Sequence, residues 1–215
     1  MKNKILIIDY GMGNVHSLIS ALKFIDCDVI LSRDYNEISK IKKIILPGVG
    51  AYDKAMENIN KYNLLEVLID FAQNKEKSIL GICLGMQILA TTGEENKHSL
   101  GLNLISGNVK KFKPIKEDTP IPHVGYNEIK ITNKVKNQAF NSFNKKDFYF
   151  VHSYYFDTMN KNDTLSTSSY GGLDFSSMVL KNNILGVQFH PEKSQSNGLK
   201  LLKLFSEFQI SKISC

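Results

Sequence analysis

The chain has 215 residues, 42% of them hydrophobic and 22% charged, with a formal net charge of +6. That length is sufficient for one domain with a sizeable core, and no stretch approaches the roughly 18 consecutive apolar residues that a membrane helix needs. The basic residues are almost all lysines scattered among acids, with Arg33 the single arginine, so a solvated surface explains the charge better than nucleic-acid binding does.

Strand and helix patterns alternate in the first half of the chain. Continuous apolar runs predict buried parallel strands at residues 4–9, 28–31, 43–46 and 78–82. Helical patterns predict helices at residues 15–25, 51–62 and 64–74 and from residue 84 onward, and Asn14 is placed to cap the first of these. Alternation of this kind predicts a central, mostly parallel sheet flanked by helices.

The second half of the chain is richer in strands. Its patterns predict strands at residues 108–112, 127–131, 147–152, 164–169, 176–180 and 184–188, followed by a final helix at 197–208. Neither a repeat nor a linker interrupts the chain. We therefore predict a single α/β domain over residues 1–215, with additional antiparallel strands in its C-terminal half.

Cysteine usage indicates a reducing compartment. Cys27, Cys83 and Cys215 are widely spaced and odd in number, which argues against a disulfide framework or a metal cluster. The first residues run directly into a strand-like segment, without the pattern of a secretory signal peptide. We therefore expect a cytoplasmic protein.

One of these cysteines lies in the turn that follows the fourth predicted strand. Gly81-Ile82-Cys83-Leu84-Gly85 has the form of a nucleophile elbow, G-x-S-x-G, with cysteine in place of serine. The glycines permit a sharp turn that lifts the side chain off the sheet, and the N-terminus of the following helix favours the reactive thiolate. Taken alone, a buried structural cysteine between two packing glycines explains the segment equally well.

Two further segments supply the other groups that acyl transfer requires. In His190-Pro191-Glu192 the proline favours an extended chain, in which residues two apart point the same way, so Glu192 can orient the His190 ring. An incidental His and Glu in a surface turn are the better explanation of this segment alone. Pro47-Gly48-Val49-Gly50 follows the third strand, and its glycines leave N–H groups free to face an oxyanion, although an ordinary turn has the same composition. All three segments follow strands whose carboxyl ends share one edge of the sheet.

At these residues the sequence resembles the class I, or triad, glutamine amidotransferases. Cys-Leu-Gly-Met-Gln at 83–87 and Phe-His-Pro-Glu-Lys-Ser at 189–194 look like the signatures of that family. Asp-Tyr-Gly-Met-Gly-Asn at 9–14, Pro-Gly-Val-Gly-Ala at 47–51 and Phe-Val-His-Ser-Tyr at 150–154 look like the glutaminase subunits of imidazole glycerol phosphate synthases. The resemblance covers essentially the whole chain, and it implies the fold of that family and hydrolysis of glutamine to glutamate and ammonia.

The resemblance also implies roles for individual residues. Cys83 would be the nucleophile, and His190 and Glu192 would complete the triad. Three further groups of positions are implied, namely the oxyanion loop with its second donor at Val49, Gly50 and Leu84, the glutamine pocket at Gln87, Glu95, Ser153 and Tyr154, and the partner interface at Asn14, Tyr126, Tyr149 and Lys193. Neither a cofactor nor a metal is expected.

The implied partner is a (β/α)8-barrel cyclase, which would form a heterodimer with the chain and receive its ammonia in histidine biosynthesis. The usual Pro-His-Met-Gly-Trp-Asn of the family reads Pro-His-Val-Gly-Tyr-Asn at 122–127, and the chain has no tryptophan. An alternative therefore stays open, in which the ammonia amidates a surface-polysaccharide sugar. A thiol peptidase of similar fold would not need Gln87 and Glu95, and a regulatory subunit would not need a triad, so these residues argue against both.

Overall fold

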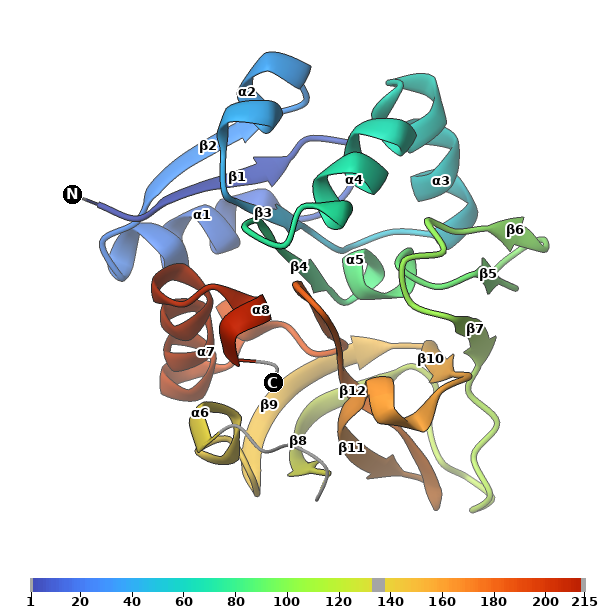
Figure 1. The fold of residues 1–215 in the computed structure, drawn as a ribbon. Coiled ribbons are helices and arrows are strands. Elements are labelled where there is room, and N and C mark those ends of the chain that lie inside the picture. Colours follow the sequence, from blue (N-terminus) through green and yellow to red (C-terminus); the bar gives the residue numbers. More distant parts are fainter. Residues whose placement is uncertain (1, 133–137, 214–215) are drawn as a thin grey trace.

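A large mixed sheet forms the centre of the computed structural model, which describes residues 2–132 and 138–213 (Figure 1). Its strand order is β2-β1-β3-β4-β13-β12-β11-β8-β9. The first five strands in that order are parallel to one another, and the last four pair antiparallel. The strands are β1 (Lys4–Ile8), β2 (Asp28–Ser32), β3 (Lys43–Leu46), β4 (Ser78–Ile82), β8 (His123–Ile131), β9 (Lys146–His152), β11 (Thr164–Tyr170), β12 (Leu173–Lys181) and β13 (Ile184–Val187).

Helices cover both faces of this sheet, as Figure 1 shows. One face packs against α1 (Val15–Phe24), α6 (Gln138–Asn141), α7 (Gln195–Glu207) and α8 (Ile210–Ile213). The opposite face packs against α2 (Tyr35–Lys40), α3 (Tyr52–Lys61), α4 (Leu64–Gln73), α5 (Leu84–Gln87) and a small second sheet of β10 (Tyr154–Thr158), β7 (Gly107–Lys111), β5 (Thr92–Gly93) and β6 (Ser99–Leu100). Two single 3-10 turns, η1 (Lys161–Asp163) and η2 (Pro191–Lys193), complete the described elements.

The apolar runs of the sequence form strands because both of their faces are buried. In β1, Ile5 and Ile7 join the core beneath α1 and α7, whereas Leu6 and Ile8 join the core beneath α3 and α4. A strand buried on both sides has no polar alternation to show, and burying each large aliphatic side chain contributes roughly 1.5–3 kcal/mol. The expected mixed α/β architecture is confirmed, and β3 and β4 have the bounds that the sequence predicts.

The structure differs from the sequence predictions at several local points. The helix after the elbow is α5, a single turn of four residues. Asn14 occupies the N-cap position of α1, but its side chain makes no capping hydrogen bond. The short helix α2 was not predicted, although its cap is regular, since the Asp34 carboxylate accepts from the N–H groups of Asn36 and Glu37. Strand β10 was not predicted either, because it is defined by its antiparallel pairing with β7.

Strand register brings the three candidate segments together. Strands β3, β4 and β13 lie side by side and parallel, with Leu46 opposite Gly81 and Val187 opposite Ile82. The loop at 47–50, the turn at Cys83 and the segment that leads to His190 therefore leave the sheet at the same edge. This edge is where open α/β sheets place their ligands.

Candidate functional site

Cys83 lies in a sharp, close-packed turn between β4 and α5. Its backbone has φ 49° and ψ −104°, and its N–H donates to the Val187 carbonyl at 2.7 Å. A Cβ atom at Gly81 would lie 2.5 Å from the Gly85 carbonyl oxygen, so the turn closes only because this position is glycine. The cysteine side chain is thereby held at the sheet edge, buried but facing a cavity.

His190 lines the same cavity and forms a buried ion pair with Glu192. The Nδ1 atom of His190 lies 2.7 Å from Oε1 of Glu192, and the two side chains are 2% and 6% exposed. The expectation of an extended chain through these residues was wrong, since only His190 is extended and Glu192 lies in the 3-10 turn η2. Proline begins this turn, and the turn still brings the two side chains together.

The charge state of His190 is set by its neighbours. Burial opposes the imidazolium form, but the Cys83 sulfur and the Glu192 carboxylate outweigh it and raise the pKa of His190 to about 10. Within the described residues, its Nε2 atom is buried without a hydrogen-bond partner. With Nδ1 held by Glu192, Nε2 is the ring atom left to move a proton.

The loop at 47–50 packs directly on the elbow. A Cβ atom at Gly48 would overlap the Ile82 carbonyl oxygen and lie 2.5 Å from the Leu84 nitrogen, so only glycine allows this approach. The buried Tyr10 hydroxyl donates to the Pro47 carbonyl, and the Gly13 N–H donates to the Val49 carbonyl at 3.1 Å. The N-terminal loop after β1 therefore fixes the position of the candidate oxyanion loop.

A cavity of about 270 Å³ joins these groups. Its wall contains the candidate catalytic, oxyanion and substrate residues, namely Cys83, His190, Val49, Gly50, Leu84, Gln87, Glu95, Ser153 and Tyr154. The Gln87 amide donates to the Tyr154 carbonyl at 2.9 Å, and Oε2 of Glu95 accepts from the Tyr52 N–H at 2.8 Å. Burial raises the pKa of Glu95. Apolar walls with a few fixed polar groups are typical of a small-molecule site.

Gln188 is a site residue that the sequence analysis missed. It follows β13 and is fully buried, and its Nε2 atom donates to the Cys83 sulfur at 3.6 Å. Its Oε1 atom accepts from the Gln87 amide at 3.2 Å. A glutamine at the end of an apolar strand was the available signal, because a buried amide requires hydrogen-bond partners.

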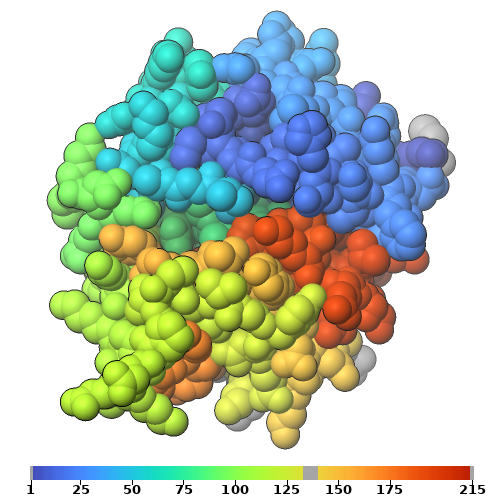
Figure 2. All heavy atoms as spheres, turned by 180° about the vertical axis from the view of Figure 1, so that it is seen from behind, coloured from blue at the N-terminus to red at the C-terminus, as the bar shows by residue number. Residues whose placement is uncertain are grey.

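Three of the residues expected at a partner interface, Tyr126, Tyr149 and Lys193, contact one another beside η2. Tyr126 is half exposed, and its hydroxyl donates to the Lys193 carbonyl at 2.9 Å. The Tyr126 and Tyr149 rings meet edge to face, and the Lys193 ammonium lies 5.7 Å from the Tyr149 ring centre. Asn14 is exposed at the start of α1. Figure 2 shows the face on which the N-terminal, 115–130 and C-terminal segments meet.

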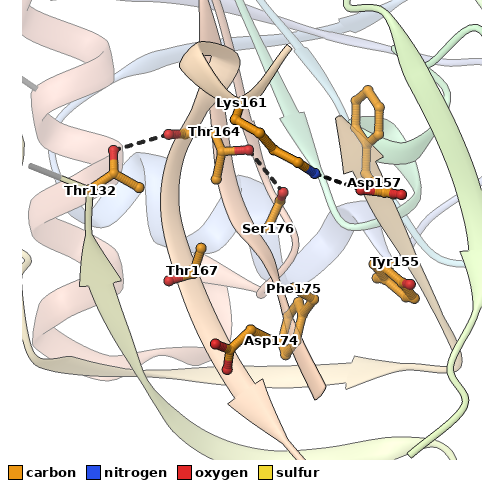
Figure 3. A pocket seen from close by; sticks show the side chains of 10 residues that line it. Thr132, Tyr155, Asp157, Lys161, Thr164, Thr167, Asp174, Phe175 and Ser176 are labelled. Atoms are coloured by element: carbon orange, nitrogen blue, oxygen red, sulfur yellow. Dashed lines mark hydrogen bonds and ion pairs between the residues drawn. The ribbon is translucent and has the colours of Figure 1, made fainter. Parts of the chain in front are cut away.

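A second, larger cavity of about 410 Å³ lies away from the nucleophile, between η1 and strands β10, β11 and β12. Tyr155 and Phe175 supply aromatic wall, and Asp157 pairs with Lys161 at 2.8 Å (Figure 3). The Thr164 hydroxyl lies 3.1 Å from the Ser176 hydroxyl. None of the residues predicted for the site lines this cavity.

Two kinds of feature are absent from residues 2–132 and 138–213. No helix in these ranges is long and apolar enough to cross a membrane. In the same part of the chain, no three His, Cys, Asp or Glu side chains are grouped so that they could hold a metal ion.

Comparison with known proteins identifies relatives along nearly the whole chain. Residues 6–207 match the family described as Glutamine amidotransferase class-I. Two proteins named Imidazole glycerol phosphate synthase subunit HisH are similar, one from Methanosarcina acetivorans, 44% identical over 95% of this chain and 98% of its own. The other, from Lactococcus lactis, is 42% identical over 95% and 98%. The solved structure titled "Structure of PurLQS from Thermotoga maritima" shares the fold, with a TM-score of 0.73, 18% identity and coverage of 95% and 98%.

Proposed function

The chain belongs to the class I glutamine amidotransferases, and on that premise we propose that it is the glutaminase subunit of an imidazole glycerol phosphate synthase. The observation that carries the proposal is the convergence on one cavity of the Cys83 thiol and the buried His190–Glu192 pair. A nucleophile, an oriented base and backbone donors are the parts that acyl transfer requires.

Cys83 attacks the side-chain carboxamide carbon of glutamine as the thiolate. The high pKa of His190 means that its ring is an imidazolium near neutral pH, and an imidazolium beside a cysteine is the activated arrangement of cysteine enzymes. A tetrahedral intermediate forms, and a backbone N–H of the loop at 47–50 together with that of Leu84 stabilises its oxyanion. Each such donor contributes roughly 3–4 kcal/mol.

Collapse of the intermediate breaks the C–N bond. His190 gives its proton to the departing nitrogen, so ammonia leaves and a glutamyl thioester remains on Cys83. His190 then accepts a proton from the attacking water, and the thioester is hydrolysed to glutamate and free thiol. Glu192 holds the ring and balances its charge but does not itself move a proton.

Ammonia has to reach an acceptor before it becomes ammonium, so a docked synthase subunit receives it. A (β/α)8-barrel cyclase fits the relatives' name, and Tyr126, Tyr149 and Lys193 contact one another beside η2, which directly follows the cavity residue His190. A partner docked on these residues would contact Tyr126, whose hydroxyl bonds to Lys193 in η2, the turn that also contains Glu192.

We expect the isolated chain to be a poor glutaminase that its partner activates. Turning over the Val49–Gly50 peptide would redirect one N–H, and it would break the bond between Gly13 N–H and the Val49 carbonyl. A net hydrogen bond is worth roughly 0.5–1.5 kcal/mol, which a partner can offset, and gaining one oxyanion donor raises the rate by roughly 10²–10³-fold.

The test is glutamate release from glutamine by the chain alone, with a histidine-pathway cyclase, and with cyclase plus its nucleotide substrate. We expect little release alone and a rise of about 10²–10³-fold in the full mixture. Full activity of the chain alone would refute the switch, and no release in any mixture would refute the glutaminase. Activation by a barrel from a polysaccharide locus, but not by the cyclase, would select the surface-sugar pathway.

A further inference from the structure

A pair of buried histidines lies beside the candidate site without belonging to the triad. His123 begins β8 and His152 ends β9, and the two residues are directly opposite each other in the register. They are 2% and 6% exposed, and Nδ1 of His123 lies 3.1 Å from Nε2 of His152. Both rings are enclosed by the aromatic side chains of Phe112, Phe150 and Phe175.

The hydrogen-bond partners assign the protons of this pair. Nδ1 of His152 lies 2.8 Å from the Tyr154 carbonyl oxygen, which only accepts, so that nitrogen carries the proton. In a neutral ring Nε2 of His152 is then an acceptor, and Nδ1 of His123 has to be the donor toward it. Burial supports the neutral state, because it lowers the pKa of His123 to about 4 and that of His152 to about 3.

The same chain of hydrogen bonds continues to the nucleophile. The Tyr154 carbonyl that accepts from His152 also accepts from the Gln87 amide at 2.9 Å. The second N–H of that amide donates to Gln188, and the Gln188 amide donates to the Cys83 sulfur. Both glutamine orientations are fixed in this way, since a flipped amide would place two donors or two acceptors in contact.

The other end of the chain lies on strand β8, whose outer face is open. Nδ2 of Asn127 lies 3.5 Å from Nε2 of His123. Because Nδ1 of His123 carries the proton, this Nε2 atom is an acceptor. On the same strand Val124 is 54% exposed and Tyr126 is 50% exposed. The Tyr126 hydroxyl also holds the Lys193 carbonyl, next to Glu192. Strand β8 is therefore bonded toward the nucleophile by one route and toward the triad acid by another.

We propose that His123 and His152 are positioning residues whose neutral, Nδ1-protonated rings carry the position of strand β8 through Tyr154, Gln87 and Gln188 to the Cys83 sulfur. This inference rests on the proposed function, because Cys83 matters only as the nucleophile. The pair transfers no proton to substrate. The pair holds the Tyr154 carbonyl in place, and this carbonyl orients the amide of Gln87 and, through it, that of Gln188. The Cys83 sulfur therefore receives a hydrogen bond from Gln188. A displacement of β8 would loosen that donor and make the sulfur less reactive.

The first experiment reads the tautomers in the unaltered chain. With ¹⁵N-labelled histidine, the nitrogen–carbon couplings of each ring distinguish a protonated Nδ1 from a protonated Nε2. We expect His123 and His152 to be neutral Nδ1–H tautomers at pH 7. An Nε2–H tautomer at either residue, or a charged ring at either, would overturn the proposal, because the assigned bond from His123 to His152 or that from His152 to the Tyr154 carbonyl would then be absent or reversed.

The second experiment measures how fast iodoacetamide alkylates Cys83, followed by mass spectrometry of its peptide. His123→Leu removes the donor to His152 from outside the cavity, and it should slow alkylation roughly three- to tenfold, the effect of one hydrogen bond. His123→Asn places an amide N–H near the position of Nδ1 and should restore most of the rate. Phe112→Leu is the matched control, since Phe112 packs on both rings without a side-chain bond to the chain.

All variants are compared at equal folded fraction, established by their thermal midpoints. The proposal is overturned if His123→Leu alkylates at the control's rate, or if His123→Asn is as slow as His123→Leu. Should His123→Leu not fold, the tautomers of the unaltered chain decide. Neither readout requires glutamine or a partner, so failure here is distinct from failure to release glutamate, which would refute the proposed function itself.

Discussion

His190 and the pair His123–His152 are all buried, yet near pH 7 the ring of His190 is charged and the other two are neutral. Burial opposes a charge on His190, but the Cys83 sulfur and the Glu192 carboxylate outweigh it and raise the pKa of His190 to about 10. Burial lowers the pKa of His123 to about 4 and that of His152 to about 3. The two sites are close in space, since the His190 N–H donates to the Tyr149 carbonyl on the same strand as His152.

The difference shows that the neighbours, and not burial, decide what a histidine does here. His190 faces the Glu192 carboxylate and the Cys83 sulfur, so its ring holds a proton that chemistry can use. His152 faces a carbonyl oxygen and another imidazole, and neither is an anion, so burial outweighs what the carbonyl contributes. One ring is suited to moving a proton and the others to holding a geometry.

Removing the Cys83 sulfur should have the largest effect on the contrast between His190 and the His123–His152 pair. Cys83→Ala should lower glutaminase activity by at least about 10⁴-fold, since Cys83 is the only thiol among the described residues that line the cavity. Ammonia-driven synthesis by the complex should continue, and the pKa of His190 should fall, because Cys83 is the main group that raises it. Glutamate assays and histidine NMR measure the two effects. Retained glutaminase activity would rule out the mechanism.

Substituting His190 and Glu192 separately should have the next largest effect. His190→Ala removes the group that moves the proton, whereas Glu192→Ala removes only its orientation and charge balance. We expect the second variant to keep roughly 10²-fold more activity than the first, measured as kcat on glutamine with the partner present. Equal losses would mean that the two side chains act as one inseparable unit.

Mild acid should lower the stability of the folded chain, because His123 and His152 are buried as neutral rings. Unfolded histidines take up protons as the pH falls below about 6.5, whereas folded His123 and His152 resist until about pH 4 and pH 3. Their contribution is therefore complete above pH 6.5 and declines as the pH falls toward those values. The raised pKa of His190 affects stability in a different pH range. The contribution of His190 to the free energy of unfolding is complete below pH 6.5 and is lost as the pH rises toward 10.

Urea unfolding at pH 7 and pH 5 measures this decline. We expect the free energy of unfolding to fall by roughly 2 kcal/mol between the two, after allowance for solvent screening. The double variant with both residues changed to asparagine is the control, and its free energy should change much less. An equal decline in both proteins would place the pH dependence elsewhere.

The smallest effect is expected at the outer end of the pair. Asn127→Ala removes a long contact of 3.5 Å to His123 and a bond of 2.9 Å to the Ser169 carbonyl. Stability should fall by about 1 kcal/mol, and glutaminase activity should fall by no more than about threefold. Chemical unfolding and glutamate assays measure these values. A loss as large as that of Glu192→Ala would show that the position of β8 matters as much as the orientation of the triad.

The sequence predicted the parts of the molecule in which local pattern and burial agree. Strands β3 and β4 were predicted with their observed bounds because both faces of each are buried. Strand β10 was missed since its partner β7 lies more than forty residues earlier, and only tertiary pairing defines it. The helix predicted from residue 84 onward begins there as α5 but ends at Gln87. The pattern did not show this end, because apolar residues continue past Gln87 into a buried loop.

The same limit applies to the site. The segments around Cys83, His190 and Val49 were found because turn-forming residues mark the ends of strands. Gln188 and the His123–His152 pair were not found, although each is buried and polar. Their roles depend on contacts between residues separated by 29 to 105 positions, as in the pairs His123–His152 and Gln188–Cys83, and no local pattern records these.

The backbone of Cys83 has a consequence for how resistant the molecule is to heat. A cysteine held at φ 49° and ψ −104° lies outside the regions that L-residues prefer, and such a conformation costs roughly 1–3 kcal/mol. Glycine would adopt it without that strain. The inactive Cys83→Gly chain should therefore melt several degrees above the active one. The reactive position is thus a weak point in the thermal durability of the molecule, and selection for durability alone would remove the nucleophile.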